Sequence, residues 1–251
     1  MNGELAQCLA IASHVSMWLA DPSGGRSGSD DLSSLPQFAD MVAFDSVVGF
    51  ETWAERLAGD GVDRLWFAVA GPGIADGPAG LPAPVSAAFM GGVPAGLLST
   101  GPAGSRLWQA QWSAGTRVAD GAEILVVNYI SEPVAIRPVR PGMDAATQAL
   151  DQTLRRAAQF ADRQQLPAWA RVFTAADHQP ARDLFPASWP DPDGPRLAGM
   201  ALAAWVFGGM GSWNDLGFAD GDVRQEYEQI SSDLFEAVMQ ACVAAVNIDL
   251  P

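Results

Sequence analysis

Residues 106–113 read RLWQAQWS, and residues 123–130 read EILVVNYI. In the first stretch, Trp108 and Trp112 alternate with glutamines, which is the two-residue period of a strand with one buried face. The second stretch is a continuous apolar run rich in branched side chains, which favours a buried strand. The residues between them are typical of a turn, so the two stretches predict an antiparallel hairpin.

The segments around this hairpin extend the β region and then change to helix. Residues 63–70 (DRLWFAVA) predict another buried strand. Pro133 and Pro138 predict that the second hairpin strand is an edge strand or leaves the sheet in an extended conformation. We therefore predict an α+β fold, with an antiparallel sheet over about residues 63–140 packed by helices from both ends of the chain. The length of 251 residues suits one large domain or two small ones, and we expect a single domain over 1–251.

Helical patterns surround the predicted sheet. Residues 4–20 predict a mostly buried helix, followed by the Gly/Ser-rich run at 23–34, which we interpret as a flexible surface loop. Asp144 is the expected cap of a helix that ends near Gln164. The inner face of that helix is expected to contain Ala146, Leu150, Leu154, Ala157 and Ala161.

The last helix is the most clearly patterned. Asp222 is its expected N-cap, with Gln225 at the partner position of a capping box, and the helix continues to about Asn247. Two stripes follow at helical spacing. The predicted inner stripe contains Tyr227, Ile230, Leu234, Val238, Ala241 and Ala245, and the outer stripe contains Glu226, Gln229, Asp233, Glu236 and Gln240.

The chain is acidic, with a formal net charge of −15 from 29 acidic and 14 basic residues, all of the latter arginine. This charge argues against nucleic acid and anionic membranes as partners, and it favours a basic protein through charge complementarity. Residues 207–251 hold eight acidic residues and one basic residue, whereas residues 141–182 hold four and five. The outer stripe of the last helix is therefore either a solvated acidic face or a docking face for a basic protein.

The sequence lacks the motifs of several common types of catalysis. Without lysine, the chain has no Schiff-base amine and no P-loop lysine. The glycine loop AGPGIADG at 70–77 is followed by prolines, so the helix that a dinucleotide-binding loop must open cannot start there. With two histidines and no cysteine pair at metal-ligand spacing, we expect no metal site and no cofactor.

The cellular location is predicted from the cysteines and the start of the chain. Cys8 and Cys242 are the only cysteines and show no disulfide-framework spacing, so we expect a reduced cytoplasmic protein. The first 20 residues include Glu4 and no positive side chain, which is unlike a secretory signal peptide. No run of about 20 residues is apolar enough to span a bilayer, so no membrane partner is expected.

The stretch GGMGSWND at 208–215 is the most unusual local sequence. Small residues precede an aromatic ring and three polar side chains. Ser212, Trp213, Asn214 and Asp215 are therefore candidate binding residues, with Trp213 as a stacking wall and Asp215 as an acid or base. The alternative is a helix end and tight turn, with Trp213 packed inward and the polar side chains bonded to turn amides. No catalytic residue is assigned.

The stretches LWFAVAGPG, ILVVNYI and VFGGMGSWND resemble segments of uncharacterised acidic bacterial proteins from GC-rich genomes, a resemblance that implies no activity. In acidity and lack of enzyme motifs, the chain is also similar to bacterial immunity proteins that neutralise toxins. We predict a cytosolic protein–protein interaction protein, most specifically an immunity-type inhibitor, that uses residues 212–215 with Glu226, Asp233 and Glu236. The alternatives are a carboxylate-based hydrolase or carbohydrate-binding protein using the 209–215 loop, and a structural subunit.

Overall fold

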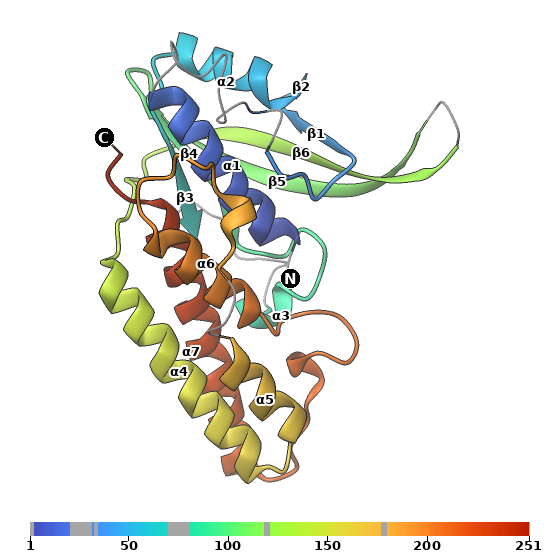
Figure 1. Ribbon diagram of the computed structural model, residues 1–251. Helices are drawn as coiled ribbons and strands as arrows, with labels where there is room; N and C mark the ends of the chain where they lie inside the picture. The colour runs from blue at the N-terminus through green and yellow to red at the C-terminus, as the bar shows by residue number, and fades with distance from the viewer. Residues whose placement is uncertain are drawn as a thin grey trace.

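The computed structural model describes residues 3–20, 32, 35–69, 81–117, 121–176 and 180–250. Two segments discussed above lie outside the described residues, namely the Gly/Ser-rich run at 23–34, except Leu32, and the glycine loop at 70–77. The described part of the chain contains seven α-helices and one six-stranded sheet (Figure 1). The predicted α+β class is therefore confirmed.

All six strands lie within residues 41–134, and the four helices α4 to α7 follow them. Helix α1 precedes the strands, and helices α2 and α3 lie between them. The strands are β1 (Met41–Phe44), β2 (Val47–Val48), β3 (Leu65–Val69), β4 (Ala95–Gly101), β5 (Gly104–Thr116) and β6 (Glu123–Val134). The helices are α1 (Gly3–Ala20), α2 (Phe50–Gly59), α3 (Ala83–Ser86), α4 (Met143–Arg163), α5 (Pro167–Ala175), α6 (Asp193–Ala203) and α7 (Gly221–Val246).

The sheet is mixed, which corrects the prediction of a purely antiparallel one. Its strand order is β2-β1-β6-β5-β4-β3, and β1 runs parallel to β6, with Met41 opposite Val126. The other neighbouring strands are antiparallel. β1 and β2 come from residues 41–48, outside the predicted range of 63–140. The apolar run of β1 is only four residues long, and so short a run carries no period by which a strand is recognised.

The hairpin of β5 and β6 is present as predicted, and Figure 1 shows it extending beyond the helices. Trp108 is buried, as its alternation with glutamine predicts. β6 lies between β1 and β5 in the sheet, so the prediction of an edge strand is wrong over residues 126–129, where both neighbours pair with it. Around Pro133 the strand pairs with β5 alone, as an edge strand does. Pro133 lies beyond the stretch that pairs with β1, where its missing N–H costs no bond to β1.

Two buried polar side chains close the outer edge of β3. Ser16 of α1 accepts a hydrogen bond from the Leu65 amide (3.1 Å) and donates one to the Leu65 carbonyl (2.9 Å). Asn247, just after α7, makes the same two bonds to Phe67, each 2.9 Å, and also donates to the Val139 carbonyl (2.9 Å). These bonds satisfy the backbone groups that an edge strand otherwise leaves unpaired.

An aromatic cluster lies between the sheet and the first two helices. The Phe44 ring stacks on Trp53 with centroids 3.7 Å apart and on Tyr129 at 5.1 Å, and Trp108 meets Trp53 edge-on at 5.1 Å. All four side chains are buried. The same continuous apolar core reaches α4 and α7, so helices from both ends of the chain pack with the sheet.

The two longest helices, α4 and α7, pack against each other, and every residue predicted for their inner faces is buried. Their predicted caps are wrong by two residues each. The N-cap of α7 is Asp220, whose carboxylate accepts the amides of Asp222 and Val223. The N-cap position of α4 is Gly142, and Asp144 lies in the first turn, where its charge suits the helix dipole.

Candidate functional site

The glycine-rich loop before α7 is an internally bonded turn. Gly211 has a φ of 83°, in the left-handed region that favours glycine. The Ser212 hydroxyl accepts a bond from the Asn214 amide (3.3 Å) and donates to the Gly208 carbonyl (3.0 Å). The Asp215 carboxylate accepts the Gly211 amide. Ser212 and Asp215 therefore hold the turn together.

Trp213 anchors this loop to the core and is not available as a stacking wall. Its side chain is 0% exposed, and its indole N–H donates to the Ser231 hydroxyl of α7 (2.8 Å). Its ring meets Phe173 and Trp169 edge-on, with centroids 5.0 and 5.5 Å apart. The Tyr227 hydroxyl donates to the Trp213 carbonyl (2.6 Å). No face of the ring is left for a ligand.

Asn214 joins the loop to α3. Its side-chain amide donates to the carbonyl of Pro84 (2.9 Å), which is 130 residues away in the sequence. Within the described part of the chain, the four predicted loop residues therefore make structural contacts. Their effect is to fix the position of the backbone between α6 and α7.

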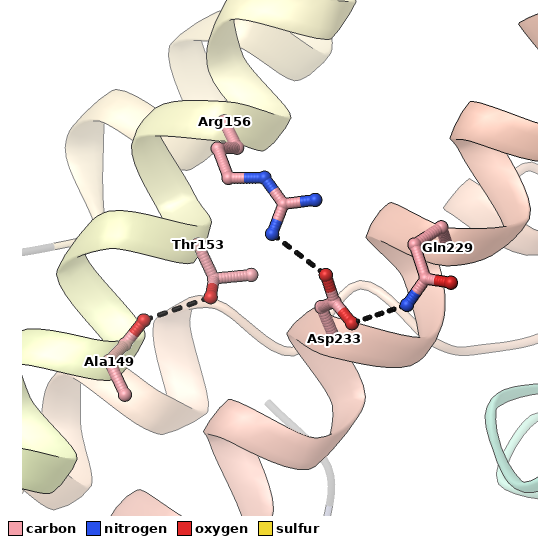
Figure 2. Close-up of polar contacts among 5 residues, drawn as sticks. All are labelled: Ala149, Thr153, Arg156, Gln229 and Asp233. Carbon is pink, nitrogen blue, oxygen red and sulfur yellow. Dashed lines mark hydrogen bonds and ion pairs between the residues drawn. The ribbon is translucent and has the colours of Figure 1, made fainter.

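The acidic outer stripe of α7 lies partly against α4. Arg156 donates to Asp233 (2.7 Å), and Arg163 donates to Glu226 (2.5 Å). Gln229 also donates to Asp233 (2.7 Å), so Asp233 is held from both helices, as Figure 2 shows. A large part of the predicted docking face is therefore an internal contact between two helices.

The two ion pairs are regularly placed. The partners are seven residues apart on each helix, and their order is reversed, as antiparallel packing of α4 and α7 requires. The side chains are partly exposed, so each pair is expected to contribute at most about 1 kcal/mol. Glu236, the third predicted acid, is exposed and makes no ion pair with any described residue.

The two predicted contact regions do not form one surface. Tyr227 and Ser231 hold the loop, whereas Glu226 and Asp233 face α4. By helical spacing these two pairs lie about a third of a turn apart around α7. The loop and the acidic stripe are consequently separate features.

A groove of about 550 Å³ lies beside the loop. Its walls come from the residues that follow α3, from α5, from the segment after α6 and from the start of α1. Phe89, Met90, Trp169 and Trp205 are among its large apolar lining residues, and Glu4 is its only ionisable one. This groove is the candidate functional site.

The groove exposes apolar side chains that a folded chain normally covers. Phe89 is 57% exposed and Met90 is 59% exposed. The groove is not visible in the sequence, because only packing brings its four segments together. One local signal exists, since Phe89 and Met90 are adjacent large apolar residues in a stretch rich in glycine and proline, where polar side chains are usual.

Glu4 ties the start of α1 to the segment after α3. Its carboxylate accepts hydrogen bonds from the backbone amides of Gly91 and Val93. Burial raises the pKa of Glu4, because removal of water disfavours the charged form, and the two amide bonds oppose that shift. Glu4 therefore brings a partly desolvated carboxylate to a groove whose other lining residues are uncharged and mostly apolar, with Ser212 of the loop among them.

Comparisons with family models, curated proteins and solved structures found no match. Among the described residues, no three His, Cys, Asp or Glu side chains are grouped so as to hold a metal ion. Within the same ranges, no helix combines the length and the apolar character needed to cross a bilayer.

A second cavity, of about 370 Å³, lies between the β1–β2 turn, the end of α2 and the β4–β5 hairpin. Asp45 and Asp60 both line it, so a carboxylate-based hydrolase would be sought there. Both oxygens of Asp45, however, accept bonds from Ser131, one from its amide (2.9 Å) and one from its hydroxyl. Arg106 donates to that hydroxyl as well (3.0 Å). Asp45 is thus engaged in positioning Ser131 and Arg106.

Proposed function

We propose that this chain is a protein–protein interaction protein that binds a basic partner at the groove beside the 208–215 loop. The observation that carries the proposal is the apolar surface left open there. Phe89 and Met90 are both more than half exposed and line one groove together with Trp205. A contiguous apolar depression of this kind is typical of an interaction site.

The chemistry of the groove suits the centre of an interface. Of the nine large hydrophobic side chains that are exposed among the described residues, three line the groove, and a fourth, Met210, lies in the adjoining loop. Aromatic residues and methionine are enriched at interface centres, where a few such anchors carry most of the binding energy. Methionine also adapts its shape to irregular partners.

The charge of the chain favours a basic partner. Its net charge of −15 attracts a basic protein over distance, which speeds and orients association. Because Glu226 and Asp233 are paired with arginines of α4, the groove is the better centre for docking than the α7 stripe. An immunity-type inhibitor of a basic toxin, acting in the cytoplasm, is the most specific form of this proposal.

The geometry does not favour the alternative of a hydrolase or carbohydrate-binding protein at the 209–215 loop. Such a site needs an exposed aromatic wall and a carboxylate directed at the ligand. Trp213 is buried, and Asp215 is bonded to the Gly211 amide within its own turn. No observation specifically favours a structural subunit.

The proposal is tested by comparing partner capture by the wild type with capture by two variants. Phe89→Ser with Met90→Ser removes the apolar anchors of the groove, and Met41→Ser removes an exposed side chain of β1 that lies outside it. We expect a basic partner whose binding weakens at least about tenfold in the groove variant, is unchanged by Met41→Ser and weakens as salt rises. Equal capture by both variants would contradict the proposal.

A further inference from the structure

We infer that the partner also binds through an extended segment that pairs antiparallel, as an added strand, with the outer edge of β5 at residues 112–116. This inference rests on the proposed function, because it names the form in which the partner of the groove is recognised. Three features of the described residues support it, namely unpaired backbone groups, side chains that leave the edge unblocked, and the closeness of the edge to the groove.

The second half of β5 has a neighbouring strand on one side only. β6 pairs with β5 from Ser105 to Thr116, whereas β4 pairs with it only as far as Trp108, which lies opposite Leu97. In Figure 1 this part of β5 lies in the hairpin that extends beyond the helices. No other described strand pairs with it there, and we call residues 112–116 the open edge.

The backbone groups of alternate residues point out of the open edge. Successive residues of an antiparallel strand direct their N–H and C=O groups to opposite sides. The Arg117 amide donates to the carbonyl of Ala122, just before β6 (2.8 Å), and the Arg106 carbonyl accepts from Ser99 of β4 (3.4 Å). The odd-numbered residues of β5 therefore bond to β6. The outward-facing groups of the open edge belong to Trp112, Ala114 and Thr116. An added strand can form about six hydrogen bonds with them.

The side chains of this part of β5 leave the edge unblocked. Native sheets protect exposed edges with charged side chains, proline, bulges or a covering element. Residues 107–116 read LWQAQWSAGT, which contains no charge and no proline, and the register with β6 runs to Thr116 without a bulge. Ala114 and Thr116 are exposed, so no described element covers them. A second copy of the chain is the less suitable occupant, because both copies carry a net charge of −15.

The open edge begins close to the rim of the groove. The rim residues Phe89 and Met90 are followed by β4, which starts at Ala95. Since Leu97 lies opposite Trp108, Ala95 lies where the pairing of β4 with β5 ends. Ala95 and Met90 are separated by at most about 18 Å of extended chain. A partner segment of about 15 residues is therefore long enough to pair with the open edge and reach the groove.

The two faces of β5 specify alternating side chains in the partner segment. In an antiparallel pair, residues directly opposite each other project to the same face. The partner residues that bond to the open edge therefore lie beside Trp112, which packs against the hydrophobic core, and apolar side chains suit that face. The residues between them lie beside Gln111 and Ser113, which are exposed, so polar side chains suit the other face. The net charge of −15 favours basic ones among them.

The experiment uses the full chain, isotope-labelled for NMR, and the probe peptide acetyl-Lys-Val-Lys-Val-Thr-Val-Lys-amide. Two modified forms each remove the N–H donors from one edge of the peptide. N-methylation of the valines removes the groups that face β5, whereas N-methylation of the residue after each valine removes those that face away. We expect the unmodified and the second modified peptide to shift the amide resonances of Trp112 and Ala114 and to slow their hydrogen exchange. Methylation of the valines should weaken binding at least about tenfold.

Two substitutions of one residue separate recognition from folding. Ala114→Pro removes an outward N–H but keeps the bonds of Ser113 and Gly115 to β6, and it should weaken binding of the unmodified peptide by about tenfold. Ala114→Val is the matched control, because it adds similar bulk and keeps the N–H, so its binding should equal that of wild type. If faster exchange at the Ser113 amide shows that proline opens the hairpin, the two methylated peptides on wild type decide the question.

The outcomes distinguish this inference from the proposed function. Absence of peptide binding up to about 5 mM, or equal binding of the two methylated peptides, overturns the added strand. Sedimentation that shows a dimer in wild type and a monomer in Ala114→Pro assigns the open edge to a second copy and overturns it as well. Partner capture that depends on Phe89 and Met90 but is unchanged in Ala114→Pro supports the groove and contradicts the added strand. Conversely, peptide pairing at the open edge without any partner that depends on the groove supports the inference and contradicts the proposed function.

Discussion

Trp205 and Trp213 lie eight residues apart on one segment and have opposite surroundings. Trp213 is fully buried, and its indole N–H is bonded to Ser231. Trp205 has a bonded N–H as well, but part of its ring remains exposed in the groove. The inner side of this segment is closed by packing and hydrogen bonds, whereas its outer side keeps apolar surface open. Binding on our proposal therefore occurs on the open side.

The largest loss of stability is expected from a substitution on the closed side of the segment. Trp213→Ala should lower the free energy of unfolding by about 3–5 kcal/mol, because it leaves a large cavity among buried rings and removes the bond to Ser231. Urea denaturation followed by circular dichroism measures this change. Trp213→Phe is the control, since it fills most of the volume without the N–H. A loss below about 1 kcal/mol for the alanine variant would contradict the role of Trp213 as a core anchor.

The edge of β3 is a second region that packing and hydrogen bonds close. Asn247→Ala should lower the free energy of unfolding by about 2–4 kcal/mol, because it leaves the amide and carbonyl of Phe67 and the carbonyl of Val139 without their partner. Hydrogen exchange at the Phe67 amide should accelerate accordingly. Asn247→Asp keeps the acceptor for the Phe67 amide but turns a buried carboxylate oxygen toward the two carbonyls, so it should be at least as destabilising as alanine. Unchanged exchange at Phe67 in the alanine variant would argue that the edge is covered in another way.

The parts of the fold that follow from the sequence are those with a local period. The alternation around Trp108 and the inner stripes of the two long helices predict burial correctly, because each is set by the geometry of its own element. β1 and β4 carry no such pattern. Residues 95–101 read AGLLSTG, which contains neither alternation nor a helical stripe, and their strand is determined by pairing with β3 and β5.

The candidate site depends almost wholly on tertiary packing. The interpretation of the α7 stripe as a free acidic face fails because its partners lie on α4, although the seven-residue spacing of Arg156 and Arg163 matches that of Glu226 and Asp233. That match is visible in the sequence once the two helices are known to be neighbours. The groove, in contrast, combines Glu4, Phe89 and Trp205, and no local pattern relates residues so far apart.

Removing the α4–α7 ion pairs should destabilise the chain less than substitutions in the closed regions and more than substitutions on the open side. Replacing both Arg156 and Arg163 by alanine should lower the free energy of unfolding by about 2 kcal/mol at most, because each of the two pairs is partly exposed. The loss should shrink further at high salt, which screens exposed charges. Urea unfolding at about 0.05 M and about 0.5 M sodium chloride measures how this loss depends on salt. Arg224→Ala is the control. A loss that does not depend on salt would mean that packing of the arginine stems carries the effect.

The smallest effect on stability is expected at the open side. Phe89→Ser should change the free energy of unfolding by no more than about 0.5 kcal/mol, because a side chain that is 57% exposed leaves little cavity behind. The same substitution should reduce binding of the basic partner and retention on a hydrophobic-interaction column. A substitution that weakens binding while leaving the fold intact marks surface that is kept for function. If Phe89→Ser instead unfolds the chain as Trp213→Ala does, the groove wall belongs to the core, and the contrast between the two sides of the segment disappears.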